Sequence, residues 1–265
     1  GKLMILETIV QSTRRRVAQK KAQKPLAQIR EEACAFDKGL SFPFETALAR
    51  EGINFICELK KASPSRGIIA SDYPYRQIAG EYEQGGAAAI SVLTEPDYFL
   101  GDDRHLADVQ KTVSIPLLRK DFFIDEYQIY EAKALGASAV LLIAAILDGA
   151  ALRDYIALCH ELGLSALVET HDAQEVEAAL QAGARIIGVN NRNLRDFSVD
   201  INNALRLRKM VPDTVLFVAE SGIKTAAEVA RLREAGVNGI LIGEALMLSS
   251  DKGKTLQNLR GDNYD

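Results

Sequence analysis

Lysine and glutamate side chains stand at the ends of several short apolar runs in this sequence. Glu58 and Lys60 end the first run, and Lys120, Glu169 and Glu220 each end another. Side chains two positions apart point to the same side of an extended strand, so Glu58 and Lys60 share a face. Ammonium and carboxylate groups that crowd one cleft acquire shifted pKa values suited to proton transfer. The pattern therefore predicts acid–base chemistry at the strand ends.

Asn190, with Arg192 close behind it, ends one more apolar run. A single charged residue at a strand end is more often a solvated loop residue than a catalyst. Five of the chain's eight apolar runs, however, end in Lys, Glu, Asn or Arg. In a parallel barrel the strand ends converge on one mouth, which would place these groups in a single cleft.

Two glycine-bearing turns follow the last two apolar runs and could bind a phosphate group. One contains Ser221 and Gly222, and the other contains Gly243 and Glu244. Barrel enzymes often hold phosphate at these two loops, where glycine lets backbone N–H groups approach the anion. Ser63, in the loop after the first run, can add a hydroxyl group, and the carboxylate of Glu244 would have to point away. Tight turns without a ligand are the alternative interpretation.

The elements that would position these groups alternate from residue 54 onward. Short runs rich in Val, Ile and Leu are separated by amphipathic stretches of about a dozen residues. Near-continuous apolar strands separated by helices indicate a parallel sheet that is buried on both faces. The eight runs are residues 54–60, 88–93, 116–119, 138–143, 164–168, 185–189, 215–219 and 238–242.

Glycine marks the junctions between helices and the next strands, because it is the favoured left-handed residue after a helix. A strand–helix unit of about 25 residues that recurs eight times is typical of a TIM, or (β/α)8, barrel. A doubly wound open sheet is the alternative, but the turn after the first strand reads KKASPSRG and has no GxGxxG motif. Two capping boxes are also expected, Thr225 with Glu228 and Asp172 with Glu175. The junction glycines are Gly86, Gly136, Gly163, Gly183 and Gly236.

The first 50 residues differ, and we expect residues 1–50 to be an N-terminal helical extension of one barrel domain, residues 51–265. The first helix carries an apolar stripe that includes Leu6 and Ile9. It also carries a basic run, for which a solvated face is favoured over nucleic-acid binding because no aromatic residues interleave it. The expected helices are residues 4–22, a segment from Pro25 to about Phe36, and residues near 43–50. The basic residues are Arg14, Arg15, Arg16, Lys20 and Lys21.

The composition argues against several classes of protein. The chain has 265 residues, of which 48% are hydrophobic, so a sizeable core is possible and disorder is not indicated. A net charge of −4 and a pI of 5.6 disfavour a nucleic-acid partner. Neither a secretory signal nor an apolar run of the roughly 18 residues needed to span a membrane is evident. The three cysteines form no CxxC pair and the three histidines show no zinc spacing, so we expect a cytoplasmic protein without a metal. We also expect a monomer.

The strand-end motifs resemble those of the indole-3-glycerol-phosphate synthase family, in order, from about Met4 to Met247. The opening MILETIVQSTRRRVAQKK is similar to that family's N-terminal helix. The combination is specific, although pieces like VAESGI and LIG recur in other phosphate-binding barrels. The matching strings are ELKKASPSRG (58–67), SVLTEPDYF (91–99), LLRKDF (117–122), LVET (167–170), GVNNRNL (188–194), VAESGI (218–223) and LIGEALM (241–247).

The resemblance implies a decarboxylating carbon–carbon lyase of tryptophan biosynthesis. Its substrate would be 1-(2-carboxyphenylamino)-1-deoxyribulose 5-phosphate and its product indole-3-glycerol phosphate. The ring carbon that bears the carboxylate would attack the sugar ketone, after which carbon dioxide and then water would leave. No redox change occurs and the ring accepts the electrons of decarboxylation, so no cofactor is expected.

The resemblance also implies a role for each charged residue. Lys120 would be the general acid towards the ketone oxygen, and Glu169 would handle protons during dehydration. Lys60 would lie near the substrate carboxylate and the leaving hydroxyl, and Glu58 would orient it. Glu220 would hydrogen-bond within the cluster. The alternative for Lys120 is a nucleophile that forms a Schiff base.

Three further groups of residues would hold the polar groups, the phosphate and the aromatic ring of the substrate. Those for the polar groups are Asn190, Arg192 and Ser221. Those for the phosphate are Ser63, Gly222, Gly243 and the backbone of Glu244. Those for the apolar wall around the ring are Phe99, Phe122 and Leu141.

Two other functions stay open. Phosphoribosylanthranilate isomerase, an enzyme of the same fold, needs one acid and one base and no crowded lysine pair, so the lysines disfavour it. The other is an inactive or artificial barrel that only binds a sugar phosphate. The chain departs from the family in two respects: it has no Trp for an N-terminal aromatic lid, and the segment after Leu248 is a weak eighth helix with little resemblance.

Overall fold

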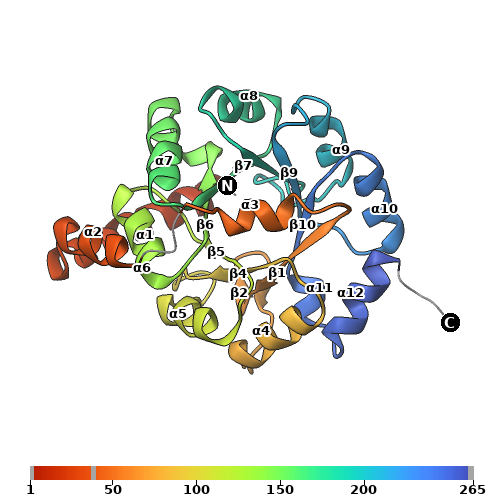
Figure 1. The fold of residues 1–265 in the computed structure, drawn as a ribbon, viewed down its shortest axis with the longest axis horizontal. Helices are drawn as coiled ribbons and strands as arrows, with labels where there is room; N and C mark the ends of the chain where they lie inside the picture. Colours follow the sequence, from red (N-terminus) through yellow and green to blue (C-terminus); the bar gives the residue numbers. More distant parts are fainter. Residues whose placement is uncertain (1–2, 37–39, 262–265) are drawn as a thin grey trace.

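Eight parallel strands close into a barrel in the computed structural model, which describes residues 3–36 and 40–261 (Figure 1). β1 (Asn54–Leu59) pairs with β4 (Ala89–Leu93) on one side and with β10 (Gly239–Ile242) on the other, which closes the sheet. All eight predicted strands are present, so the barrel is confirmed and the open sheet is excluded. The other strands of the barrel are β5 (Leu117–Lys120), β6 (Ala139–Ile143), β7 (Ser165–Thr170), β8 (Ile186–Asn190) and β9 (Leu216–Glu220).

Helices cover the outside of the barrel (Figure 1). Between β1 and the first of them the chain makes a small hairpin, β2 (Ala62–Ser63) and β3 (Gly67–Ile68). The segment expected to be a weak eighth helix forms α11 (Glu244–Met247) and α12 (Lys252–Arg260), and Leu256 in α12 is fully buried. The remaining elements are α4 (Tyr75–Gln84), α5 (Asp103–Thr112), α6 (Glu126–Leu135), the 3-10 turn η1 (Ala144–Ile146), α7 (Gly149–Glu161), α8 (Ala173–Gln181), α9 (Asn202–Arg208) and α10 (Ala226–Glu234).

One end of the barrel is closed by an N-terminal helix. Ile56 and Leu167 point into the barrel and belong to a buried cluster that also contains Phe44 and Leu48 of α3 (Pro43–Leu48). Leu48 lies so close to the start of β10 that a Cβ atom on Gly239 would be 2.7 Å from its Cδ2 atom. Because α3 packs where the strands begin, only the end where the strands finish is available for a site.

The helix ends follow the sequence signals closely. Thr225 and Glu228 form the expected capping box at the start of α10. At α8 the expected box is only half formed: Asp172 accepts the N–H of Glu175 at 2.9 Å, but the Glu175 carboxylate accepts the N–H of His171. The five junction glycines all have positive φ, as expected, and are Gly86 (87°), Gly136 (96°), Gly163 (74°), Gly183 (91°) and Gly236 (84°).

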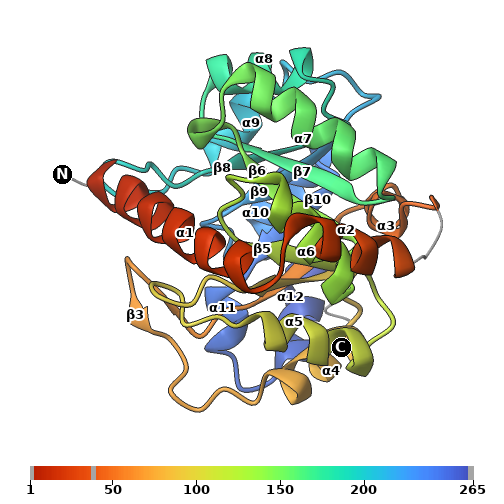
Figure 2. The ribbon, with the colours of Figure 1, turned by 90° about the vertical axis from the view of Figure 1, so that its left-hand side faces the viewer.

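The three helices expected before the barrel are present. The first residues of α1 lie on the same side of the molecule as β3 (Figure 2). Val17 of α1 packs with Ile29 of α2 and Tyr127 of α6. None of the described helices has the length and apolar character that crossing a lipid bilayer requires. The two helices not yet bounded are α1 (Leu3–Gln23) and α2 (Leu26–Ala35).

The solvated-face interpretation of the basic run is wrong for three of its five cations. The Nζ atom of Lys20 lies 2.7 Å from Asp103, and that of Lys21 lies 2.6 Å from Asp125. Arg16 contacts carboxylates in the loop between β4 and α5. The sequence shows that the helix is basic, but it does not show the acidic partners, because they lie far along the chain. The two cations of the run that are exposed are Arg14 and Arg15.

Candidate active site

The strand ends open into two adjoining cavities at one mouth of the barrel. The larger, of about 810 Å³, is lined largely by charged and polar residues, and the smaller, of about 190 Å³, includes a group of apolar side chains. Every site residue named from the sequence lines one or both. Those that line both are Lys60, Lys120, Glu169, Asn190, Arg192, Ser221 and Glu244. Those that line only the larger are Glu58, Glu220, Gly222 and Gly243. Those that line only the smaller are Ser63, Phe99, Phe122 and Leu141.

A buried carboxylate joins the two lysines of the mouth. Glu58 Oε2 lies 3.0 Å from the Nζ atom of Lys120, and its Oε1 atom lies 3.1 Å from the Nζ atom of Lys60. Ser91 on β4 donates its hydroxyl to Oε2 at 2.7 Å. Three neighbouring strands, β4, β1 and β5, therefore fix one cluster, and Glu58 and Lys60 share a face as strand alternation requires.

The cluster keeps Glu58 ionised and Lys120 protonated. Burial opposes the ionisation of Glu58, but Lys120 and Lys60, with the Ser91 hydroxyl, outweigh it and lower its pKa to about 2. Burial likewise opposes the charge of Lys120, but Glu58, Glu220 and Glu169 outweigh it and raise its pKa above its ordinary value. Lys120 is therefore an ammonium group that can donate a proton.

Glu220 has the opposite protonation behaviour. Burial, followed by the nearby Glu169 carboxylate, raises the pKa of Glu220 well above its ordinary value, and Lys120 only partly offsets this. Neither oxygen of Glu220 accepts a hydrogen bond from a described residue. Glu220 therefore binds its proton more tightly than an ordinary carboxyl group does.

Asn190 and Ser221 form a second polar group, at the ends of β8 and β9. Ser221 donates its hydroxyl to Asn190 Oδ1 at 2.9 Å, and the N–H of Arg192 donates to the same oxygen at 3.0 Å. Ser221 and Gly222 both have positive φ, 73° and 80°. A Cβ atom on Gly222 would lie 2.1 Å from Val199, so glycine is required at this turn. These two consecutive left-handed residues form the tight turn that was expected after β9.

The other glycine turn holds an ion pair across the mouth. Gly243 packs closely on β1, because a Cβ atom there would lie 3.1 Å from that of Glu58. The Glu244 carboxylate lies 2.6 Å from Arg66 Nη1, in the loop between β2 and β3. Ser63 accepts the N–H of Arg66 at 3.2 Å. Two of the expected phosphate residues, Ser63 and Glu244, therefore contact a cation that was not among the expected site residues.

Apolar side chains from two strand-end loops and one N-terminal helix surround the smaller cavity. The rings of Phe99 and Phe122 lie 6.0 Å apart at an angle of 42°. Ile5, Leu6 and Ile9 of α1 line the same cavity. The chain has no Trp, and these aliphatic side chains occupy the place where an aromatic lid was considered. The helical stripe in the sequence contained Leu6 and Ile9 but did not show that they face the site.

His171 is another cavity-lining residue that sequence reasoning missed. It follows β7 directly, and its Nε2 atom lies 3.7 Å from Glu169 Oε2. A lone histidine after a strand carries no signal of its own, so only the fold reveals this neighbour. Ser91 was missed for the same reason, because in the sequence it looks like an ordinary strand residue.

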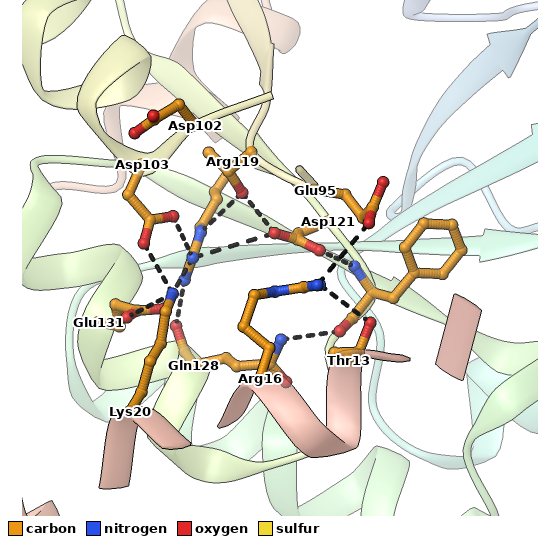
Figure 3. A network of polar contacts seen from close by, with 12 residues as sticks. Thr13, Arg16, Lys20, Glu95, Asp102, Asp103, Arg119, Asp121, Gln128 and Glu131 are labelled. Carbon is orange, nitrogen blue, oxygen red and sulfur yellow. Dashed lines mark hydrogen bonds and ion pairs between the residues drawn. The ribbon is translucent and has the colours of Figure 1, made fainter. Parts of the chain in front are cut away.

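A buried network fixes the strand that carries Lys120. Arg119 is 1% exposed and its guanidinium lies 2.8 Å from Asp103 and 2.7 Å from Glu131 (Figure 3). Lys20 of α1 contacts the same two carboxylates, at 2.7 and 3.0 Å. Asp121 also lies 4.0 Å from the guanidinium of Arg119, so two cations face three carboxylates beside the active strand, and α1 supplies one of the two cations.

Comparisons with known proteins agree with this geometry. A sequence model of the family "Indole-3-glycerol phosphate synthase" matches residues 6–259. Proteins of that name from Ruminiclostridium cellulolyticum and Endomicrobium trichonymphae are 54% and 51% identical to this chain; each alignment covers 97% of it, and 99% and 100% of the relative. The crystal structure of 3-hexulose-6-phosphate synthase from Salmonella typhimurium has a TM-score of 0.64 at 14% identity, covers 78% of this chain and 96% of its own, and shows a shared fold alone. The chain therefore belongs to the indole-3-glycerol phosphate synthase family, whose activity is that of a decarboxylating lyase and not that of the isomerase alternative.

Proposed function

We propose that the lysine–glutamate cluster closes the indole ring of 1-(2-carboxyphenylamino)-1-deoxyribulose 5-phosphate. The phosphate would lie in the larger cavity near Gly222, and the aromatic ring in the smaller one near Phe99 and Phe122. Lys120 lines both cavities, where the sugar between those two ends would pass. The proposal depends above all on the Lys120 ammonium, held 3.0 Å from the buried Glu58 carboxylate between the two cavities.

In the first half of the reaction the ring carbon attacks the ketone carbon while Lys120 protonates the ketone oxygen. An ammonium group offers a developing alkoxide both a charge and a proton. The bond to the carboxylate carbon then breaks, its electrons restore the aromatic ring, and carbon dioxide leaves. Asn190 and Ser221 would hold polar groups of the sugar during this step.

In the second half Lys60 protonates the departing hydroxyl and Glu169 takes a proton from the neighbouring sugar carbon. The double bond of the indole ring forms and water leaves. Over the whole reaction the two lysines deliver two protons to oxygen and Glu169 recovers one. One proton is therefore taken up from solvent in each turnover.

The Schiff-base alternative for Lys120 conflicts with its surroundings. A nucleophilic lysine must lose its proton, and nearby carboxylates stabilise the protonated form. The pKa of Lys120 is raised because Glu58, Glu220 and Glu169 outweigh the effect of burial. Treatment with borohydride in the presence of substrate should therefore leave no adduct on Lys120.

Indole fluorescence should appear when the protein is mixed with the carboxyphenylamino substrate. Lys120→Ala should lower kcat by about a thousandfold or more, because it removes the acid of the first step. Lys111→Ala, at an exposed lysine of α5, is the matched control and should keep full activity. A folded wild-type protein that makes no product contradicts the proposal, and an active Lys120→Ala variant contradicts the role of Lys120.

We also propose that the chain acts as a monomer in the cytoplasm. The residues that line both cavities come from one chain. Cys57 and Cys159 are free and buried, which suits a compartment that keeps thiols reduced. Sedimentation equilibrium at micromolar concentration tests the first statement, and a concentration-dependent dimer would contradict it.

A further inference from the structure

His171 lies between two carboxylates, one inside the active site and one outside it. Its Nε2 atom lies 3.7 Å from Glu169 Oε2, and its Nδ1 atom lies 3.1 Å from Glu175 Oε1. The three side chains become steadily more exposed, from 8% for Glu169 through 12% for His171 to 22% for Glu175. They therefore form a short path from the mouth of the barrel towards solvent.

The start of α8 is arranged to hold this imidazole. In a capping box the glutamate would accept the N–H of the helix cap, Asp172. Here the Glu175 carboxylate instead accepts the backbone N–H of His171 at 2.9 Å and faces its Nδ1 atom. Asn203 of α9 donates to the carbonyl of His171 at 3.1 Å. Both the backbone and the ring of His171 are therefore fixed.

The contacts also determine where the protons of the pair must lie. An ionised Glu175 can only accept a hydrogen bond, so Nδ1 of His171 carries a hydrogen. Nε2 accepts and donates no hydrogen bond among the described residues, and it faces Glu169. A lone pair on Nε2 would meet an acceptor-only carboxylate, and this repulsion becomes an attraction when Nε2 carries a proton. The geometry therefore favours an imidazolium beside an ionised Glu169.

We propose that His171 is a positioning residue for Glu169 that orients its carboxylate and keeps it ionised, ready to take a proton from the substrate. Nδ1 of His171 keeps its hydrogen bond to Glu175 throughout, and the protonated Nε2 faces Glu169. Glu169 accepts the carbon-bound proton and later releases it to water at the mouth of the barrel. One proton enters and one leaves, and no hydrogen of His171 moves, so the resting state returns. This inference depends on the proposed role of Glu169.

The charges around His171 support this arrangement. Glu169 on β7 and Glu175 and Asp172 at the start of α8 face it, and Arg192 lines the same cavity. Burial lowers the pKa of His171, but the hydrogen bond to Glu175 and then Glu169 outweigh burial, so the pKa is raised overall. The imidazolium therefore persists to higher pH than that of a free histidine and is lost as the pH rises through the raised value.

The experiment compares His171→Asn with wild type in single-turnover assays that follow carbon dioxide release and indole fluorescence separately. We expect carbon dioxide release to be unchanged and indole formation to slow by about a hundredfold, the lower range for a proton-transfer group. KM should stay within about twofold, because the variant keeps the substrate-binding residues. The alkaline fall of kcat that His171 causes in wild type should be absent. His160→Asn, on α7, is the matched control and should behave as wild type.

The outcomes separate a failure of the proposed function from a failure of the role inferred for His171. If wild-type protein makes no indole product, the proposed function fails, whatever His171 does. If wild type is active and His171→Asn slows both halves equally, or changes only KM, the residue is merely structural and the inference is wrong. An unchanged rate and pH profile also overturn it. Should His171→Asn fail to fold, Glu175→Gln keeps the imidazole but not its fixed tautomer, and it must slow indole formation selectively.

Discussion

Two glutamates at the mouth show how neighbours decide the charge of a residue. Glu58 lies between two lysines and its pKa is lowered to about 2, although burial alone would raise it. Glu220 is also buried, and burial together with the neighbouring Glu169 raises the pKa of Glu220 well above the ordinary value. The same side chain therefore loses its proton more readily than usual at one strand end and less readily than usual at another.

Glutamine substitutions distinguish these two states. Glu58→Gln removes the carboxylate that both ammonium groups contact, so we expect kcat to fall by about a hundredfold or more. Glu220→Gln replaces a carboxyl group whose ionisation is already opposed by an amide of the same shape, so we expect a change of less than about tenfold. Steady-state kinetics at pH 7 and pH 8 measure both, with thermal melting as the control for folding. Equal losses in the two variants would show that the inferred charge states are wrong.

The sequence predicted a set of residues that line the cavities at the strand ends, but it did not predict how their pKa values shift. Strand alternation predicts that Glu58 and Lys60 share a face, and barrel geometry predicts that Lys120 and Glu169 meet them. Which carboxylate holds a proton depends on contacts of about 3 Å between residues far apart in the chain. His171 and Arg66 were missed for the same reason, since each acts through one partner that only the fold brings near.

At the scale of elements, α1 joins the barrel in two ways. Its first turns supply Ile5, Leu6 and Ile9 to the apolar cavity, and its second half supplies Lys20 to the network around Arg119. The apolar contact and the ionic contact lie at different points along one helix. A substitution that weakens the ion pairs of Lys20 should therefore also disturb the apolar cavity that α1 lines.

Lys20→Met tests this coupling. Asp103 and Glu131 would then share only Arg119, so we expect a loss of about 1 kcal/mol in the free energy of unfolding. We also expect KM to rise by roughly threefold with a smaller change in kcat, because α1 lines the cavity but carries no proton-transfer group. Arg14→Met, at an exposed position of the same helix, is the matched control. Kinetics and urea unfolding measure the effects, and a KM equal to that of wild type would refute the coupling.

The elements themselves were largely predictable because their signals are local. The eight strands begin and end within about two residues of the apolar runs, and the left-handed glycines mark the preceding helix ends. The hairpin of β2 and β3 was not predicted, since four residues with no apolar pattern form it. The basic run of α1 was misread because its ion pairs connect segments more than 80 residues apart.

At the scale of the whole molecule, charge and apolar packing are separated along the barrel axis. α3 closes the end where the strands begin with apolar side chains, whereas buried ion pairs gather where the strands finish. The division at residue 50 into extension and barrel stays a prediction, since α1 and α3 both pack on the barrel. Stability at the open end depends on ionisation, so it should vary with pH.

Acid should remove the stabilisation that comes from two carboxylates with lowered pKa values, Glu58 and Asp103. Glu58 has an ordinary pKa of 4.5 and a folded pKa of about 2, so its stabilising effect is complete above 4.5 and is lost as the pH falls towards 2. Arg119 and Lys20 outweigh burial and lower the pKa of Asp103, which adds a loss of the same sign. For Glu58 alone the loss is on the order of 3 kcal/mol. Urea unfolding of wild type and Glu58→Gln at pH 7, 4 and 3 should give free energies that converge in acid, and a constant difference between them would exclude Glu58 as the source.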